Sequence, residues 1–127
     1  MLRQTDAIEV RRVKGKGRGV FALRPIREGE VIERAPVLVL DVDSLDEATA
    51  IQGLWSHCFL WGRGKVALAL GYGSLYNHSY RPNARYDDVG RQTKVFTALR
   101  DIAPGEEITI NYNGSPDDRA PVGFEVL

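Results

Sequence analysis

The sequence predicts a mostly β domain of several small sheets with one short helix. Short runs of β-branched residues recur along the chain, glycine and proline turns separate them, and one stretch carries a helix-start pattern. The 127 residues are the length of one domain. The 43% hydrophobic content is typical of a globular protein with a packed core.

The predicted strands follow one another in chain order. Each is a short apolar or alternating run next to turn residues, and they cover residues 8–13, 20–23, 31–32, 37–42, 66–70, 84–87, 93–99 and 108–112. Pro36 separates the third from the fourth. Ser44 and Glu47 form a capping box, which predicts a helix over about 44–53. Residues 114–127 predict a turn-rich tail.

Two segments repeat each other. Residues 22–32 and 98–108 are identical at seven of eleven aligned positions, and each pattern is typical of a strand, a turn and a second strand. The likeness has two explanations, shared turn chemistry or two similar β units. Both favour a β-rich domain.

The composition removes several classes of protein. With 17 Lys and Arg against 17 Asp and Glu, the chain has no net positive charge to attract nucleic-acid phosphates. We therefore expect no nucleic-acid binding. No apolar stretch reaches the length of a membrane span. The single cysteine excludes an intramolecular disulfide and a cysteine zinc cluster, and the histidines give no metal pair. We therefore predict an intracellular, cytoplasmic protein without a metal; nuclear or host-directed placement stays open.

Three clusters could carry chemistry. Lys16, Gly17, Arg18 and Gly19 form a glycine-rich turn, Asn77 and His78 offer an amide and an imidazole, and Tyr112 ends the last predicted strand. Taken singly, each has a plain structural explanation: a turn, a structural histidine, a core tyrosine.

Together, their order and spacing resemble the SET domain of protein-lysine methyltransferases. The resemblance covers about residues 8–113, with 114–127 as a tail to a single domain over 1–127, and it is closest to the minimal bacterial and viral SET proteins. It implies the β-clip fold of this family. It also implies a C-terminal pseudoknot, in which the segment ending near Tyr112 threads a loop around Asn77 and His78.

The resemblance also implies an activity. The family transfers a methyl group from S-adenosylmethionine to a lysine of a protein, for instance a histone, and releases S-adenosylhomocysteine. A lysine-bearing protein would be the partner, and viral relatives make a homodimer plausible. Carried over by position, the cofactor-binding residues are Lys16, Gly17, Arg18, Gly19, Asn77 and His78, the catalytic residue is Tyr112, and the substrate channel has Tyr72, Tyr76 and His57.

Departures from the family keep two rivals open. His57 and Cys58 stand where related enzymes often have a tyrosine, which would suit a catalytically silent SET module that binds a protein partner. The tail lacks the cysteines of a zinc-binding cap, and only Phe124 offers aromatic cover. The second rival, an unrelated β-rich structural protein, predicts no cofactor binding at all.

Overall fold

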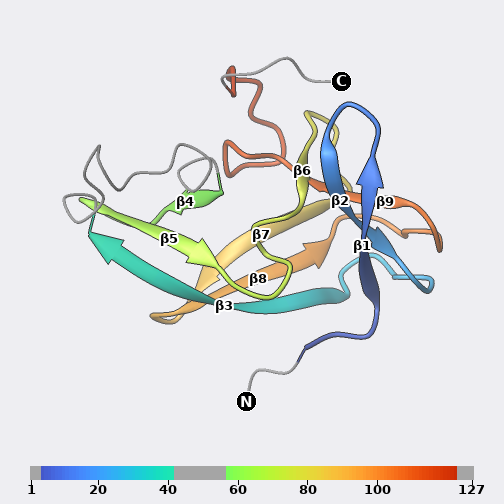
Figure 1. Ribbon diagram of the computed structural model, residues 1–127, viewed down its shortest axis with the longest axis horizontal. Coiled ribbons are helices and arrows are strands. Elements are labelled where there is room, and N and C mark those ends of the chain that lie inside the picture. Colours follow the sequence, from blue (N-terminus) through green and yellow to red (C-terminus); the bar gives the residue numbers. More distant parts are fainter. Residues whose placement is uncertain (1–3, 42–56, 123–127) are drawn as a thin grey trace.

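The structure, a computed structural model, describes residues 4–41 and 57–122 (Figure 1). Within these ranges it contains two sheets and no helix. The helix predicted over 44–53 and Phe124 lie outside the described residues. The strands are β1 (Ile8–Val13), β2 (Gly17–Ala22), β3 (Val31–Asp41), β4 (Cys58–Leu60), β5 (Lys65–Ala69), β6 (Asn77–His78), β7 (Ala84–Val89), β8 (Thr93–Ala98) and β9 (Glu107–Ile110).

The smaller sheet brings the two ends of the chain together. Its order is β1-β2-β9-β6, and it lies on the right in Figure 1. β1 and β2 form a hairpin, and β2 pairs antiparallel with β9. β6 is short but pairs in parallel with β9, with Asn77 opposite Thr109 and His78 opposite Ile110. This pairing places the predicted Asn-His motif beside the end of the last strand.

The larger sheet has the order β4-β5-β3-β8-β7. The predicted break at Pro36 is wrong, because β3 runs through it as one strand of 11 residues. The part of β3 up to Pro36 pairs with β8, whereas the part from Val37 pairs with β5. Pro36 thus lies where the strand changes neighbours, a place where a missing N–H is tolerated.

Other strand boundaries differ from the predicted ones by a few residues. β2 begins inside the glycine-rich turn, at Gly17, because Arg18 and Gly19 pair with β1. β9 ends at Ile110, so Tyr112 follows the strand instead of closing it. β4 and β6 were missed because runs of three and two residues carry no readable periodicity.

The two repeated segments face each other. Ile26 and Ile102, which occupy equivalent positions, exchange backbone hydrogen bonds of 2.9 and 2.7 Å. Each segment also has an equivalent ion pair, Arg24 with Glu30 and Arg100 with Glu106. The repeat therefore consists of two similar β units, which pair with each other through backbone hydrogen bonds.

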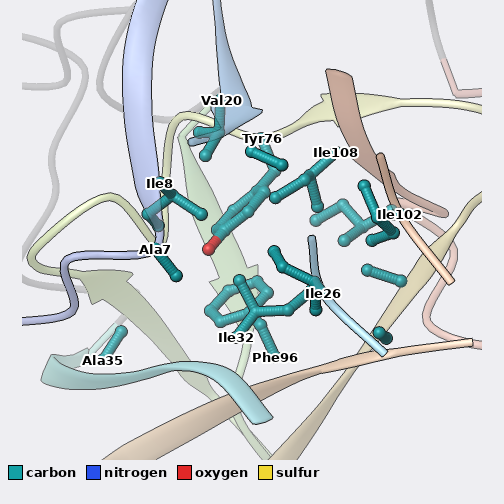
Figure 2. Packing of buried hydrophobic residues seen from close by; sticks show 14 of the residues in the cluster. Ala7, Ile8, Val20, Ile26, Ile32, Ala35, Tyr76, Phe96, Ile102 and Ile108 are labelled. Carbon is teal, nitrogen blue, oxygen red and sulfur yellow. The ribbon is translucent and has the colours of Figure 1, made fainter. Parts of the chain in front are cut away.

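The core fills the space where these units meet the sheets. Figure 2 shows Ile8, Ile26 and Ile108 beside the ring of Tyr76, with Ile102 farther along the same cluster. Tyr76 stacks on Phe96, with ring centroids 4.4 Å apart. The core thus fixes the segment that leads into β6.

The paired isoleucines should dominate the stability of this region. Ile26 and Ile102 are each 1% exposed, so Ile26→Ala and Ile102→Ala should each lower the free energy of unfolding in urea by about 2–4 kcal/mol. Leu60→Ala is the control, because Leu60 is 86% exposed and should change stability by less than about 0.5 kcal/mol. An isoleucine variant as stable as the control would contradict this packing.

Candidate functional site

Tyr112 is fixed at both ends by one segment of chain. Its backbone N–H donates to Nδ1 of His78 at 3.0 Å, and its hydroxyl donates to the backbone carbonyl of Tyr76 at 2.5 Å. The ring of His78 also lies against that of Tyr112, with centroids 5.2 Å apart. The predicted catalytic tyrosine and the predicted cofactor-binding histidine are therefore in direct contact.

A buried asparagine holds β9 in place for this contact. The side chain of Asn83 donates to the carbonyl of Glu107 at 2.8 Å and accepts from the N–H of Thr109 at 2.9 Å. Asn83 is 2% exposed, so these bonds form away from water, where an unmade bond is costly. The Pro-Asn pair that follows the Asn-His motif thus has a structural use.

The glycine-rich turn meets Asn77 on the other side of this motif. The Asn77 amide donates to the carbonyl of Arg18 at 2.9 Å and to the carboxylate of Glu107 at 2.6 Å. Lys16 lies 3.8 Å from the same carboxylate. A Cβ at Gly19 would lie 2.8 Å from the Asn77 amide nitrogen, so only glycine permits this approach. The predicted cofactor-binding residues thus come together as one polar cluster, here called the 16–19/77 cluster.

Tyr112 also lines a cavity of about 330 Å³. Four groups surround it: β4 with the residue before it, the segment leading into β6, the β7–β8 hairpin, and the chain after β9. The lining residues are His57, Cys58, Phe59, Leu60, Ser74, Tyr76, Tyr86, Asp88, Lys94, Tyr112, Asn113 and Gly114.

Tyr86 is the aromatic wall that the sequence analysis missed. Its hydroxyl donates to the carbonyl of Tyr112 at 3.2 Å, and its ring packs edge-on against Phe59 at 5.0 Å. The signal was available, because alternation along residues 84–87 places Tyr86 on the same face as the buried Ala84.

Two of the three predicted channel residues line the cavity. His57 lines the cavity, with its Nδ1 2.9 Å from the carbonyl of Ser74. Tyr76 also lines it, but the Tyr76 hydroxyl donates to the buried carboxylate of Glu33, so its main chain faces Tyr112. Tyr72 does not line this cavity, and its hydroxyl accepts a hydrogen bond from Gln4.

Glu33 fixes the loop that carries these tyrosines. Its carboxylate accepts from the N–H of Tyr72 at 2.9 Å and from the hydroxyl of Tyr76 at 2.8 Å. Burial raises the pKa of Glu33, although both hydrogen bonds oppose the shift. Gly71 is needed beside it, because its φ is +61° and a Cβ there would collide with the carboxylate.

The tyrosines of the site stay protonated near neutral pH. Burial, followed by the charge of Glu107, raises the pKa of Tyr112 to about 12. Burial, followed by the charge of Asp88, raises the pKa of Tyr86 to about 12. Both are therefore neutral hydroxyls that donate and accept hydrogen bonds.

Among residues 4–41 and 57–122, no three His, Cys, Asp or Glu side chains are grouped to hold a metal ion. In the same part of the chain, no helix has the length and apolar character of a membrane span.

Comparison with known proteins identifies a family and relatives. The SET domain model matches residues 17–113. A histone-lysine N-methyltransferase of Schizosaccharomyces pombe, specific for H3 lysine 37, is 37% identical over 106 residues, which are 83% of this chain and 72% of that protein. An N-lysine methyltransferase of Danio rerio is 30% identical over 121 residues, 84% of this chain but 35% of that protein.

A solved structure of similar fold is also named as a candidate histone methyltransferase. The crystal structure of a candidate histone methyltransferase of Plasmodium falciparum superposes with a TM-score of 0.71 and 28% sequence identity. The match covers 87% of this chain and 96% of that one.

The buried imidazole of His78 should have a depressed pKa. Burial, with a smaller contribution from the charge of Lys16, lowers the pKa of His78 below 6.5. The unfolded chain then binds the proton more tightly, so the stability from His78 is complete above pH 6.5 and is lost as the pH falls through the lower native pKa. NMR titration, with signals assigned by His57→Gln, should give a value below 6.5 for His78. A midpoint at or above 6.5 would contradict the neutral acceptor at Nδ1.

Proposed function

This chain belongs to the SET-domain family, and we propose that it transfers a methyl group from S-adenosylmethionine to a lysine side chain of a protein. Histone H3 is the first candidate substrate, because the S. pombe relative acts on that protein. The observation that carries the proposal is the position of Tyr112. It contacts His78 beside the 16–19/77 cluster and also lines the cavity.

The 16–19/77 cluster fits the methyl donor. Lys16 offers a cation for its carboxylate, while the Asn77 amide oxygen and nearby main-chain groups offer hydrogen bonds for its polar groups; the Asn77 NH2 group is held by Arg18 and Glu107. When bound, S-adenosylmethionine supplies an electrophilic methyl group on a sulfonium. The cofactor would thus be bound next to Tyr112 by Lys16, Gly17, Arg18, Gly19, Asn77 and His78.

The cavity fits a lysine side chain. Phe59 and Tyr86 offer ring faces for the aliphatic stem, and the chain around Tyr112 offers oxygens for the amine. The Tyr112 hydroxyl gives its hydrogen to the Tyr76 carbonyl, so toward the substrate amine its oxygen would act as a hydrogen-bond acceptor. The Tyr112 hydroxyl oxygen and a main-chain oxygen near it would together orient the amine. Methyl transfer needs the amine nitrogen aligned with the methyl group.

No side chain of the site needs to act as a general base. A tyrosine with a pKa of about 12 does not take a proton near neutral pH. The substrate ammonium instead loses its proton to water as it enters the cavity, since desolvation disfavours the charged form. Bound S-adenosylmethionine would supply the methyl carbon for the neutral amine, and Tyr112 would orient the amine toward it.

The silent-module alternative rests on His57 and Cys58. The cavity nevertheless keeps two tyrosines, Tyr86 and Tyr112, and joins them through a main-chain hydrogen bond. The departure at 57–58 therefore affects the size and polarity of the wall, while the proposed amine-binding oxygens remain.

Methyl transfer should depend on the Tyr112 hydroxyl. Radiolabelled methyl from S-adenosylmethionine should appear on recombinant histone H3, and Tyr112→Phe should reduce the rate about a hundredfold or more, because a transition-state hydrogen bond is lost. Tyr80→Phe is the matched control, since the Tyr80 hydroxyl donates to the Ala120 carbonyl in the tail. Equal loss in both variants, or full activity of Tyr112→Phe, would contradict the assignment.

Cofactor affinity should depend on the 16–19/77 cluster. Calorimetric titration with S-adenosylmethionine should show at least about tenfold weaker binding for Asn77→Ala, since hydrogen bonds that organise the site are removed. Gly19→Ala should have a similar effect because its Cβ displaces the Asn77 amide. Gln92→Ala, an exposed amide beside β8, is the control. Unchanged affinity in the first two variants would move the cofactor site elsewhere.

A further inference from the structure

A buried lysine lies in the wall of the cavity. Lys94 is on the inward face of β8, where its neighbours Phe96 and Ala98 belong to the hydrophobic core. Its exposed fraction is 1%, and it lines the cavity together with Tyr112. Lysine is almost never buried to this extent unless its charge is compensated.

Three aromatic rings and one carboxylate hold the ammonium. Nζ lies 4.3 Å from the ring centre of Phe59, 4.5 Å from that of Tyr86 and 5.5 Å from that of Trp61. It also donates to Asp88, the residue opposite on β7, at 2.6 Å. The electron-rich ring faces attract the cation. These rings are therefore already engaged by a charge of the chain itself.

The charges of this ion pair are not equally screened. The Asp88 side chain is 46% exposed, whereas that of Lys94 is 1% exposed. Water weakens the field of an exposed charge much more than that of a buried one. The interior of the cavity consequently experiences more of the cation than of the anion.

We propose that Lys94 is a specificity-determining residue, whose charge makes the cavity favour the uncharged amine of an entering lysine over its ammonium. The inference rests on the proposed function, because it requires the substrate lysine to occupy this cavity. Like charges repel, and the rings that could have stabilised a second ammonium already hold Lys94. The substrate N–H bond breaks with its proton going to water, which leaves the lone pair that attack requires.

Other titratable groups face the same space. Burial raises the pKa of Cys58, and it raises the pKa values of Tyr86 and Tyr112 to about 12 each. These groups are thus neutral from pH 7 to about 8.5. Burial lowers the pKa of Lys94 itself, against the opposing effects of Asp88 and Asp87, so its loss of charge is coupled to that of the substrate. The remaining titratable groups at the cavity are Tyr76 and His57.

The dependence of the turnover number on pH tests whether the charge of Lys94 disfavours the substrate ammonium. The probe is recombinant histone H3, and kcat is used because it reports ionisations in the enzyme–substrate complex. In Lys94→Met, which keeps the length of the side chain, the midpoint of the rise in kcat should move up by about one pH unit. Near pH 7, kcat should then fall roughly tenfold while KM also falls, because the ammonium binds more readily.

Two further variants make the test directional. Asp88→Asn should move the midpoint down, since it removes the anion and keeps the cation. Lys65→Met is the matched control, because Lys65 also pairs with an aspartate across strands but its side chain is 48% exposed. Parallel pH profiles of wild type and Lys94→Met, or shifts of the same sign in Lys94→Met and Asp88→Asn, would overturn the inference.

Binding separates this inference from the proposed function. With S-adenosylhomocysteine present, wild type should bind a histone H3 tail peptide containing one lysine more tightly as the pH rises, and Lys94→Met should lose most of that gain. Equal pH dependence in both proteins overturns the role of Lys94, even if methyl transfer occurs. Binding with the expected pH dependence but no transfer overturns the proposed function alone, and absence of both binding and transfer overturns both.

Discussion

The parallel pairing of β6 with β9 is the constraint on which the site depends. Two residues of β6 are enough to bring Asn77 and His78 beside a strand that begins 29 positions after His78 in the sequence. Tyr112 is then held from both sides, by the His78 imidazole and the Tyr76 carbonyl. The core reinforces this arrangement through the buried ring of Tyr76, and Asn83 does so through its bonds to β9.

Tyr112 links two environments of different chemistry, because it contacts His78 next to Asn77 and also lines the cavity. The 16–19/77 cluster is polar, built from amides, a carboxylate and a cation that contact one another. The described wall of the cavity consists largely of rings and includes the ion pair between the buried Lys94 and the half-exposed Asp88. Such a division suits a reaction in which a polar donor and an amine meet end to end, because each reactant finds its own complement and the tyrosine marks the junction.

The sequence predicted the fold class and most strands because apolar alternation and turn residues are local signals. It could not predict β6, since two residues show no period, or the unbroken β3, because the effect of Pro36 depends on which strands lie beside it. Tyr86 and Lys94 were missed for a related reason. Each follows ordinary strand alternation, and only the packing of β4 against the β7–β8 hairpin gathers them around one cavity. Tyr72 was assigned to the channel wall from the family resemblance, but it does not line this cavity, and its hydroxyl accepts a hydrogen bond from Gln4.

The central claim is that donor and lysine occupy opposite sides of Tyr112. Backbone NMR shift mapping with S-adenosylhomocysteine is the direct test, because this reaction product should bind without a protein substrate. We expect the largest shifts at residues 16–19, 77–78 and 112, with little change at Phe59, Trp61 and Lys94. Shifts concentrated on Phe59, Trp61 and Lys94, with residues 16–19 unaffected, would contradict it.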